Sequence, residues 1–305
     1  MKIKNKKAQV MTLIAIFLII LIFITFEVFS ISQQRYSTAT RISTMENFLN
    51  SIELNLERQI FISGFRIIFI AEDEIIKSGN YINDINYFFN ESFFNGTVNG
   101  EENDILLGAR YRDLIDSINE KAGKINVIIN MSNSSIYVYQ SDPWNVKITF
   151  ISNFIMEDKS NLARWNKIQN ITATIPIEGF EDPIYFINTN GKISNKINKT
   201  IYDAFPSNNT SVLIEHTKNS YYISSNLSPS FLDRIEGKIT PNQYGIESLV
   251  YLPKLENQGI QVKQKSIVDY IYFSSLNPQP HQIQGMPSWF KLDSGHLEIY
   301  NATAS

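Results

Sequence analysis

The first part of the chain is apolar on every side. Val10–Phe26 contains no charged residue, and as a helix at about 1.5 Å per residue it spans roughly 26 Å. Continuing this helix to Ile31 gives roughly 33 Å, which is enough to cross the hydrocarbon core of a membrane. Because a helix packed on a soluble core has a polar face, this pattern predicts a transmembrane helix over residues 10–31.

The helical periodicity continues beyond this segment, but only one face stays apolar. Apolar residues recur at intervals of three and four, at Ile42, Met45, Leu49, Ile52 and Leu56. Since no proline or glycine interrupts residues 10–63, we predict that the membrane helix runs on as an amphipathic helix over residues 32–78. Its apolar stripe needs a cover, which is either the rest of this chain or neighbouring subunits.

The rest of the chain mixes the helical and the alternating period. Helices are expected over residues 82–89, 105–122 and 230–235, with Gly123 ending the second. Alternating or short apolar runs predict strands over residues 125–129, 146–150, 171–177, 184–187, 192–193, 212–214, 221–224, 246–252 and 267–273.

These elements define the predicted fold class, which is α+β. A transmembrane helix continues into a long amphipathic helix, and a head with a largely antiparallel β-sheet and a few helices follows. The head divides into an α+β part over residues 79–240 and a C-terminal β-rich part, or subdomain, over residues 241–305. Pro176 places its strand at a sheet edge because proline cannot donate to a ladder. Asn188–Gly191 predicts a hairpin turn.

Composition removes several classes of function. The 305 residues carry a formal net charge of -3, so the basic footprint of a nucleic-acid-binding protein is missing and no nucleic-acid partner is expected. The chain has no cysteine, which excludes disulfides, thiolate metal sites and thiol nucleophiles.

The basic residues before the apolar segment predict the topology. Residues 1–9 form a tip that contains no acid and carries Lys2, Lys4, Lys6 and Lys7. Positively charged flanks stay on the cytoplasmic side, so we expect a single-pass protein whose bulk is extracellular and whose first partner is the lipid bilayer. A secretory signal peptide that is removed is the alternative. Against it, the apolar run is long and no A-x-A-like site follows.

The junction between the tip and the apolar segment carries a short motif. It reads Lys6-Lys7-Ala8-Gln9-Val10-Met11-Thr12-Leu13. This motif resembles the class III signal peptide of archaeal type IV pilin-like proteins. The resemblance implies cleavage between Ala8 and Gln9 by a prepilin peptidase, and other pilin-like subunits as partners. At Leu13 the chain departs from many pilins, which have a glutamate at the fifth mature position.

Three further segments carry a second resemblance. Residues 140–144, 179–185 and 268–273 are similar to recurring segments of membrane-anchored archaeal surface proteins of unassigned role. That likeness implies a location at the cell surface and no activity.

Acceptor motifs for N-glycosylation begin only at residue 90. Asn-x-Ser/Thr, with x never proline, occurs at Asn90, Asn95, Asn130, Asn133, Asn170, Asn198, Asn208, Asn209, Asn226 and Asn301. On the strand around residues 171–177, Asn170 falls on the outward face together with Thr172 and Thr174. This distribution fits a glycoprotein whose head faces the outside.

No motif for catalysis, metal binding or nucleotide binding is present. The only imidazoles are His216, His281 and His296, and neither a G-x-S-x-G elbow nor an H-E-x-x-H run accompanies them. The spacing of Asp293 and His296 favours a structural hydrogen bond over a shared ligand. Paired acids such as Glu101-Glu102, Asp104 or Glu181-Asp182 are of the type that binds a calcium ion or serves acid–base work, but loop solvation explains them at least as well. We therefore expect no enzyme, no cofactor and no metal site.

Three functional hypotheses follow. The first is a membrane-anchored, extracellular pilin-like surface protein with a structural or adhesive role. The second is a monomeric binding or sensor protein on a helical stalk. The third is a membrane-tethered hydrolase with a carboxylate-only site, which leaves no local motif and requires a deep pocket with two facing carboxylates.

Overall fold

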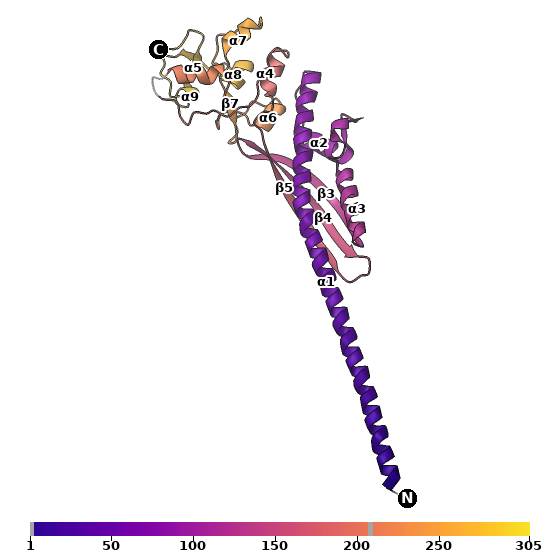
Figure 1. Ribbon diagram of the computed structural model, residues 1–305. Helices are drawn as coiled ribbons and strands as arrows, with labels where there is room; N and C mark the ends of the chain where they lie inside the picture. Colours follow the sequence, from indigo (N-terminus) through magenta and orange to yellow (C-terminus); the bar gives the residue numbers. More distant parts are fainter. Residues whose placement is uncertain (1–2, 207–209) are drawn as a thin grey trace.

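The dominant feature of the molecule is one long helix. The computed structural model describes residues 3–206 and 210–305, and α1 runs without a break over Ile3–Ser78. At about 1.5 Å per residue such a helix is about 110 Å long. Its first half stands free, whereas its second half lies in the head (Figure 1). The predicted continuation of the apolar helix into an amphipathic helix is confirmed, and the fold is α+β.

A three-stranded antiparallel sheet lies along the second half of α1. The strands β3 (Val127–Asp142), β4 (Asn145–Asp158) and β5 (Arg164–Pro176) pair in the order β3-β4-β5. Three predicted strands are confirmed as parts of this sheet. β5 is an edge strand that ends at Pro176, as predicted.

The sheet has one buried and one open face. Every second residue of β4 is buried, from Val146 to Asp158, while the residues between them are partly exposed. The buried face packs on α1 and on α3 (Tyr111–Lys124). Hence the head itself covers the apolar stripe of α1. Met45, Leu49, Ile52 and Leu56 are all buried, and only Ile42, at 39% exposure, lies outside the contact.

Short elements connect α1 to the sheet. They are α2 (Ile85–Asn90), a π-helical turn (Glu91–Asn95), β1 (Thr97–Val98), β2 (Glu101–Glu102) and a 3-10 turn (Asp104–Leu106). The helix predicted over residues 105–122 begins only at Tyr111, because Gly108 adopts a positive φ of 79° that interrupts it. Gly123 does not end that helix, which continues to Lys124.

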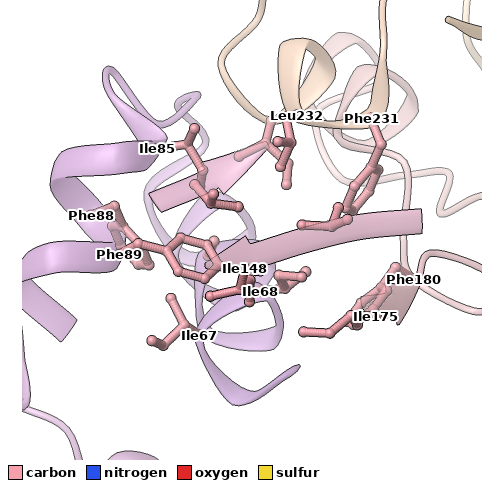
Figure 2. Packing of buried hydrophobic residues seen from close by; sticks show 14 of the residues in the cluster. Ile67, Ile68, Ile85, Phe88, Phe89, Ile148, Ile175, Phe180, Phe231 and Leu232 are labelled. Carbon is pink, nitrogen blue, oxygen red and sulfur yellow. The ribbon is translucent and has the colours of Figure 1, made fainter. Parts of the chain in front are cut away.

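The main core forms where α1, α2, the sheet and the first residues of the C-terminal part converge. Ile67 and Ile68 of α1 face Phe88 and Phe89 of α2 across the sheet residue Ile148 (Figure 2). From the other side the core is closed by Phe180, Phe231 and Leu232. The contact is close at Gly64, where a Cβ atom would lie 1.9 Å from Cδ1 of Ile148. A glycine in the middle of a helix therefore has a packing role here.

The C-terminal part consists of short elements around its own apolar core. These are α4 (Pro183–Asn188), α5 (Thr210–Lys218), β6 (Tyr222–Ser224), α6 (Phe231–Ile235), β7 (Ile246–Ser248), α7 (Leu252–Asn257), α8 (Asp269–Phe273), β8 (Pro280–Gln282), β9 (Lys291–Asp293) and α9 (Ser294–Leu297). It lies beyond the end of the sheet that is remote from the free half of α1 (Figure 1). Of the predicted elements, the strand around residues 221–224 and the helix around 230–235 are confirmed.

Several predicted strands of this part are helices. Residues 184–187 lie in α4, residues 212–214 in α5 and residues 267–273 mostly in α8. Short apolar runs do not distinguish a strand from a buried helix, and capping decides here. The side chain of Asp182 accepts a hydrogen bond from the N–H of Ile184 at 3.0 Å, and Pro183 occupies the first turn.

Two neighbouring predictions fail for related reasons. Asn190 and Gly191 do adopt positive φ angles, but they follow the end of α4 instead of forming a hairpin. The strand predicted over residues 246–252 stops at Ser248, because Pro253 stands in the first turn of α7. Residues 241–305 thus contain helices as well as strands and are not simply β-rich.

Candidate functional site

The free half of α1 is the candidate membrane anchor. In the described part of the chain, α1 is the one helix that is long and apolar enough to cross a membrane, and none of its apolar window is buried. Large side chains such as Leu13 and Phe17 are exposed. Ala8 and Gln9, the predicted cleavage site, lie in the first turns of this helix. Lys4, Lys6 and Lys7 precede them in α1, and Lys2 lies outside the described residues.

The predicted glycosylation acceptors lie almost entirely on the surface. Of the eight acceptors within the described residues, only Asn90 is half-buried, and its amide donates to the carbonyl of Asn86 at 2.8 Å. The exposed acceptors are Asn95, Asn130, Asn133, Asn170, Asn198, Asn226 and Asn301. Asn208 and Asn209 lie outside the described residues. Asn170 is on the open face of the sheet with Thr172 and Thr174, as predicted.

A buried ionic centre holds the C-terminal part together. Arg234 of α6 is fully buried, and its Nη1 lies 2.6 Å from Oδ2 of Asp182 and 3.0 Å from Oδ2 of Asp269. Its Nη2 donates to the carbonyl of Ile246. The carboxylate of Asp269 also accepts from the N–H and the hydroxyl of Ser248, at 2.9 and 2.8 Å. Burial raises the pKa of Asp269, and the guanidinium of Arg234 opposes this shift.

A second buried group adjoins the first through β7. His296 Nδ1 lies 2.8 Å from Oδ1 of Asp293, and Nε2 lies 3.4 Å from Oε2 of Glu247. Burial alone lowers the pKa of His296, but its hydrogen bonds to Asp293 and Glu247 raise it to about 10. The imidazole is therefore charged at neutral pH. The predicted structural hydrogen bond between Asp293 and His296 is confirmed.

The two other histidines make no hydrogen bond to this group. His216 is buried in α5, where burial lowers its pKa to about 4, and its Nε2 has no hydrogen-bond partner among the described residues. His281 is in β8, and its Nε2 lies 2.8 Å from the hydroxyl of Ser294. Within residues 3–206 and 210–305, no three His, Cys, Asp or Glu side chains are grouped to hold a metal ion.

The buried ionic groups are closed to solvent. Arg234, Asp182, Asp269 and Glu247 are each 0% exposed, so a substrate has no access to them in this conformation. We assign them a structural role. Sequence reasoning missed this centre because its members come from positions 182 to 296. The signal it left is the presence of single charges inside apolar runs, such as Asp269 in Ile267–Phe273.

Of the acids considered in the sequence, only Asp182 takes part in the buried ionic centre. Glu101 and Glu102 are exposed in β2, and Asp104 starts the 3-10 turn. Glu181 and Asp182 separate: the former is half-buried and accepts from Ser194, whereas the latter belongs to the buried ionic centre.

Glu72 of α1 is a buried acid beside a pocket that holds a second carboxylate. It is 6% exposed, and burial raises its pKa to about 9. The pocket beside it, which Glu181 and Phe186 also line, has a volume of about 90 Å³. Ligand sites are typically about 300 to 1,000 Å³. This pocket is therefore too small for a sugar ring, and it gives no support to the carboxylate-only hydrolase.

A larger, open groove lies between the sheet and the C-terminal part. It has a volume of about 620 Å³ and is lined by Trp144, Lys199, Thr200, Tyr202, Asp203, Ala204, Phe205, Ile223, Ser224, Glu298, Ile299 and Asn301. A second hollow of about 340 Å³ shares Ser224 and Ile299 with it and continues toward Pro143 and Gln243. We call these two hollows together the distal groove.

The walls of the distal groove are held by backbone contacts. Trp144, in the turn between β3 and β4, donates its N–H to Asp142 at 2.9 Å, and its carbonyl accepts from Ile177 at 3.0 Å. On the opposite wall, the N–H of Thr200 donates to the carbonyl of Tyr222 at 2.8 Å. Lys199 Nζ bridges the two walls, lying 5.4 Å from the centroid of the Trp144 ring.

Comparison with known proteins adds no assignment to this geometry. No family model, curated protein or solved structure matches the chain.

Proposed function

We propose that this chain is a membrane-anchored surface protein of the pilin-like type, with its head outside the cell and a structural or adhesive role. The observation that carries the proposal is the continuity of α1, which joins a bare apolar segment to the core of the head without a break. From Ile31 to Met45, the first buried residue of the stripe, the helix rises about 20 Å. The head is thus held off the membrane by a rigid support.

The charge of the tip and the surface position of the acceptors support the outward orientation. Four lysines precede the apolar segment, and they favour a cytoplasmic N-terminus. Seven exposed acceptors, all in the head, support passage of the head through a glycosylating compartment or surface pathway.

Protease treatment of intact cells tests the topology. We expect an added protease to degrade the head and leave a protected fragment that contains residues 10–31. Replacing Lys2, Lys4, Lys6 and Lys7 with glutamate should reduce the protease-accessible fraction, whereas the same change at Lys121 and Lys124, which are exposed in α3, should not. A head that resists protease until the cells are lysed contradicts the proposal.

The N-terminal residue of the mature protein tests the pilin-like part. Processing between Ala8 and Gln9 leaves Gln9 as the first residue and keeps the apolar segment. An Ala8→Trp variant should retain Met1 and its tip, while Ala39→Trp in the exposed part of α1 should be processed normally. An unprocessed Met1 in the wild type, with protease accessibility intact, favours a single-copy binding protein on a helical stalk.

The stalk alternative is supported by the distal groove, which lies at the end of the sheet remote from the free half of α1. Negative-stain images of cells that carry the protein separate the two functions. Filaments that disappear with the gene support a subunit, and a surface without such filaments supports a stalk.

A further inference from the structure

We propose that the distal groove binds a neutral carbohydrate chain. This inference rests on the proposed surface location and names the class of ligand that an adhesive head would bind. It starts from the size and position of the groove. Its main hollow, of about 620 Å³, falls within the usual range for ligand sites.

The groove is also held far from the membrane. Trp144 lies next to the strand pair that packs against α1 at Gly64, and Gly64 is 33 residues beyond Ile31. At about 1.5 Å per residue this places the groove about 50 Å above the outer end of the apolar segment. At this height, a carbohydrate polymer on another surface reaches the groove without contacting the bilayer in which the chain is anchored.

The charges of the groove decide between classes of ligand. Lys199 contributes one positive charge, and Asp203 and Glu298 contribute two negative charges. A phosphate or another polyanion meets two carboxylates there, and no three carboxylate or imidazole groups of the described residues are placed to hold a metal ion. An uncharged ligand is not repelled by the carboxylates, and it needs no metal ion to neutralise them.

The remaining lining fits a polyol. Thr200, Tyr202 and Ser224 carry hydroxyls that both donate and accept hydrogen bonds, and Asn301 carries an amide that does the same. Trp144 offers a half-buried aromatic ring of the kind on which the C–H face of a sugar packs. Sugar hydroxyls need donors and acceptors together, and these side chains supply both in the hollow that Trp144 also lines.

The shape of the groove favours a chain over a single sugar. The second hollow of about 340 Å³ adjoins the first, with which it shares the lining residues Ser224 and Ile299. It carries Ser225, Asn226 and Gln243, which again are uncharged hydrogen-bonding side chains. Consecutive sugar residues therefore find similar partners along the groove.

A second source of the same chemistry is the chain itself, because Asn301 in the main hollow and Asn226 in the second hollow are predicted acceptors for N-glycosylation. The amide of Asn301 donates to the carbonyl of Phe205 at 2.9 Å. A glycan on either residue starts at the groove and competes with an external carbohydrate, so the experiment needs an arm that removes it.

Titration of the full chain in lipid nanodiscs tests the inference. The probes are hexasaccharides of glucose, mannose, galactose and N-acetylglucosamine, with the hexamer of galacturonic acid as the charged counterpart, and the readout is tryptophan fluorescence with calorimetry. We expect saturable binding of at least one neutral probe. Trp144→Ala and Glu298→Ala, both in the lining of the main hollow, should each weaken that binding tenfold or more, whereas Tyr87→Ala, an exposed aromatic of α2, should leave it unchanged.

The outcomes separate the hypotheses. Absence of binding for all neutral probes, preference for the galacturonic acid hexamer, or equal effects of Trp144→Ala and Tyr87→Ala each overturns the inference. Binding that arises only in Asn301→Gln, or only when Asn226→Gln is added to it, identifies the chain's own glycan as the occupant and overturns the external ligand. Glu298→Ala is an exposed change, so it keeps the test decisive if Trp144→Ala unfolds. Protease accessibility of the head is measured separately. It tests the proposed surface location and does not depend on carbohydrate binding.

Discussion

The body of the head, which consists of α1 and the strands β3, β4 and β5, and the C-terminal part, which follows residue 180, are stabilised in different ways. In the body, α1 and three strands of 13 to 16 residues bury continuous apolar faces against each other. The described residues of the C-terminal part after residue 180 form helices of at most nine residues and strands of three, so few regular hydrogen bonds hold it. There, charged side chains from distant positions meet inside the core.

This difference predicts how strongly a single substitution lowers the stability of each part. Apolar packing over a long interface spreads the free energy of folding over many side chains, so single substitutions have moderate effects. A buried charge depends on one or two partners, and removing a partner leaves the other charge without compensation. We therefore expect the largest single-residue effects in the C-terminal part.

The largest effect is expected at the buried ionic centre. Arg234→Met removes the charge that faces Asp182 and Asp269, both fully buried. The free energy of unfolding of the C-terminal part should fall by about 3 to 5 kcal/mol. Hydrogen exchange should show faster exchange in α6 and α8 while β4 stays protected.

The matched control is Arg112→Met in α3. Arg112 Nε lies 3.8 Å from Oδ2 of Asp116, and both side chains are well exposed. Surface pairs of this kind contribute little, so the change should stay within about 0.5 kcal/mol. Equal effects of the two substitutions, or loss of protection in β4 together with α6, contradict the division of the head into two differently stabilised parts.

A smaller and pH-dependent effect is expected at Glu72, where the two parts meet. Burial raises the pKa of Glu72 to about 9 in the folded chain, above its ordinary value of 4.5. The folded state therefore retains a proton that the unfolded state loses, and stability falls as the pH rises from about 4.5 toward 9. Glu72→Gln removes this dependence, so at pH 7 it should raise the free energy of unfolding by about 3 kcal/mol.

Urea denaturation at pH 4 and pH 7 checks this. At pH 4 the wild type and Glu72→Gln should have similar stability, because the carboxyl is largely neutral in both states. Glu74→Gln, on the same helix, serves as the control. Two parallel stability curves for the wild type and Glu72→Gln between pH 4 and pH 9 would show that Glu72 is ionised in the folded chain.

The contrast between the two parts also explains what the sequence predicted. The alternation around Val146–Phe150 survives in a long strand because it has one buried and one open face, and α1 follows from an uninterrupted apolar period. The apolar runs at residues 184–187 and 267–273 are too short for their period to be decisive, and for the first of them the cap Asp182 favours the helix.

The candidate sites were less predictable than the fold. Trp144, Lys199, Ser224 and Glu298 meet in the distal groove from four separate segments, and no motif predicts that they meet. The apolar half of α1 and the Asn-x-Ser/Thr motifs are readable from the sequence because each is encoded by adjacent residues. Spatial grouping of distant residues depends on the fold of the C-terminal part, for which the periodic pattern is weakest.

The smallest effect tests the packing of the body, at Gly64 of α1. A Cβ there would lie 1.9 Å from Cδ1 of Ile148 and 2.8 Å from Cδ1 of Ile175, both fully buried. Gly64→Ala should lower the free energy of unfolding by about 1 to 2 kcal/mol, because overpacking outweighs the better helix propensity of alanine. Gly123→Ala in α3, where a Cβ meets no atom of the described residues within 4 Å, should instead stabilise by about 0.5 to 1 kcal/mol. Thermal unfolding of both variants compares them directly. If Gly64→Ala stabilises as Gly123→Ala does, α1 and the sheet adjust to each other, and the contact between them at Gly64 is not tightly packed.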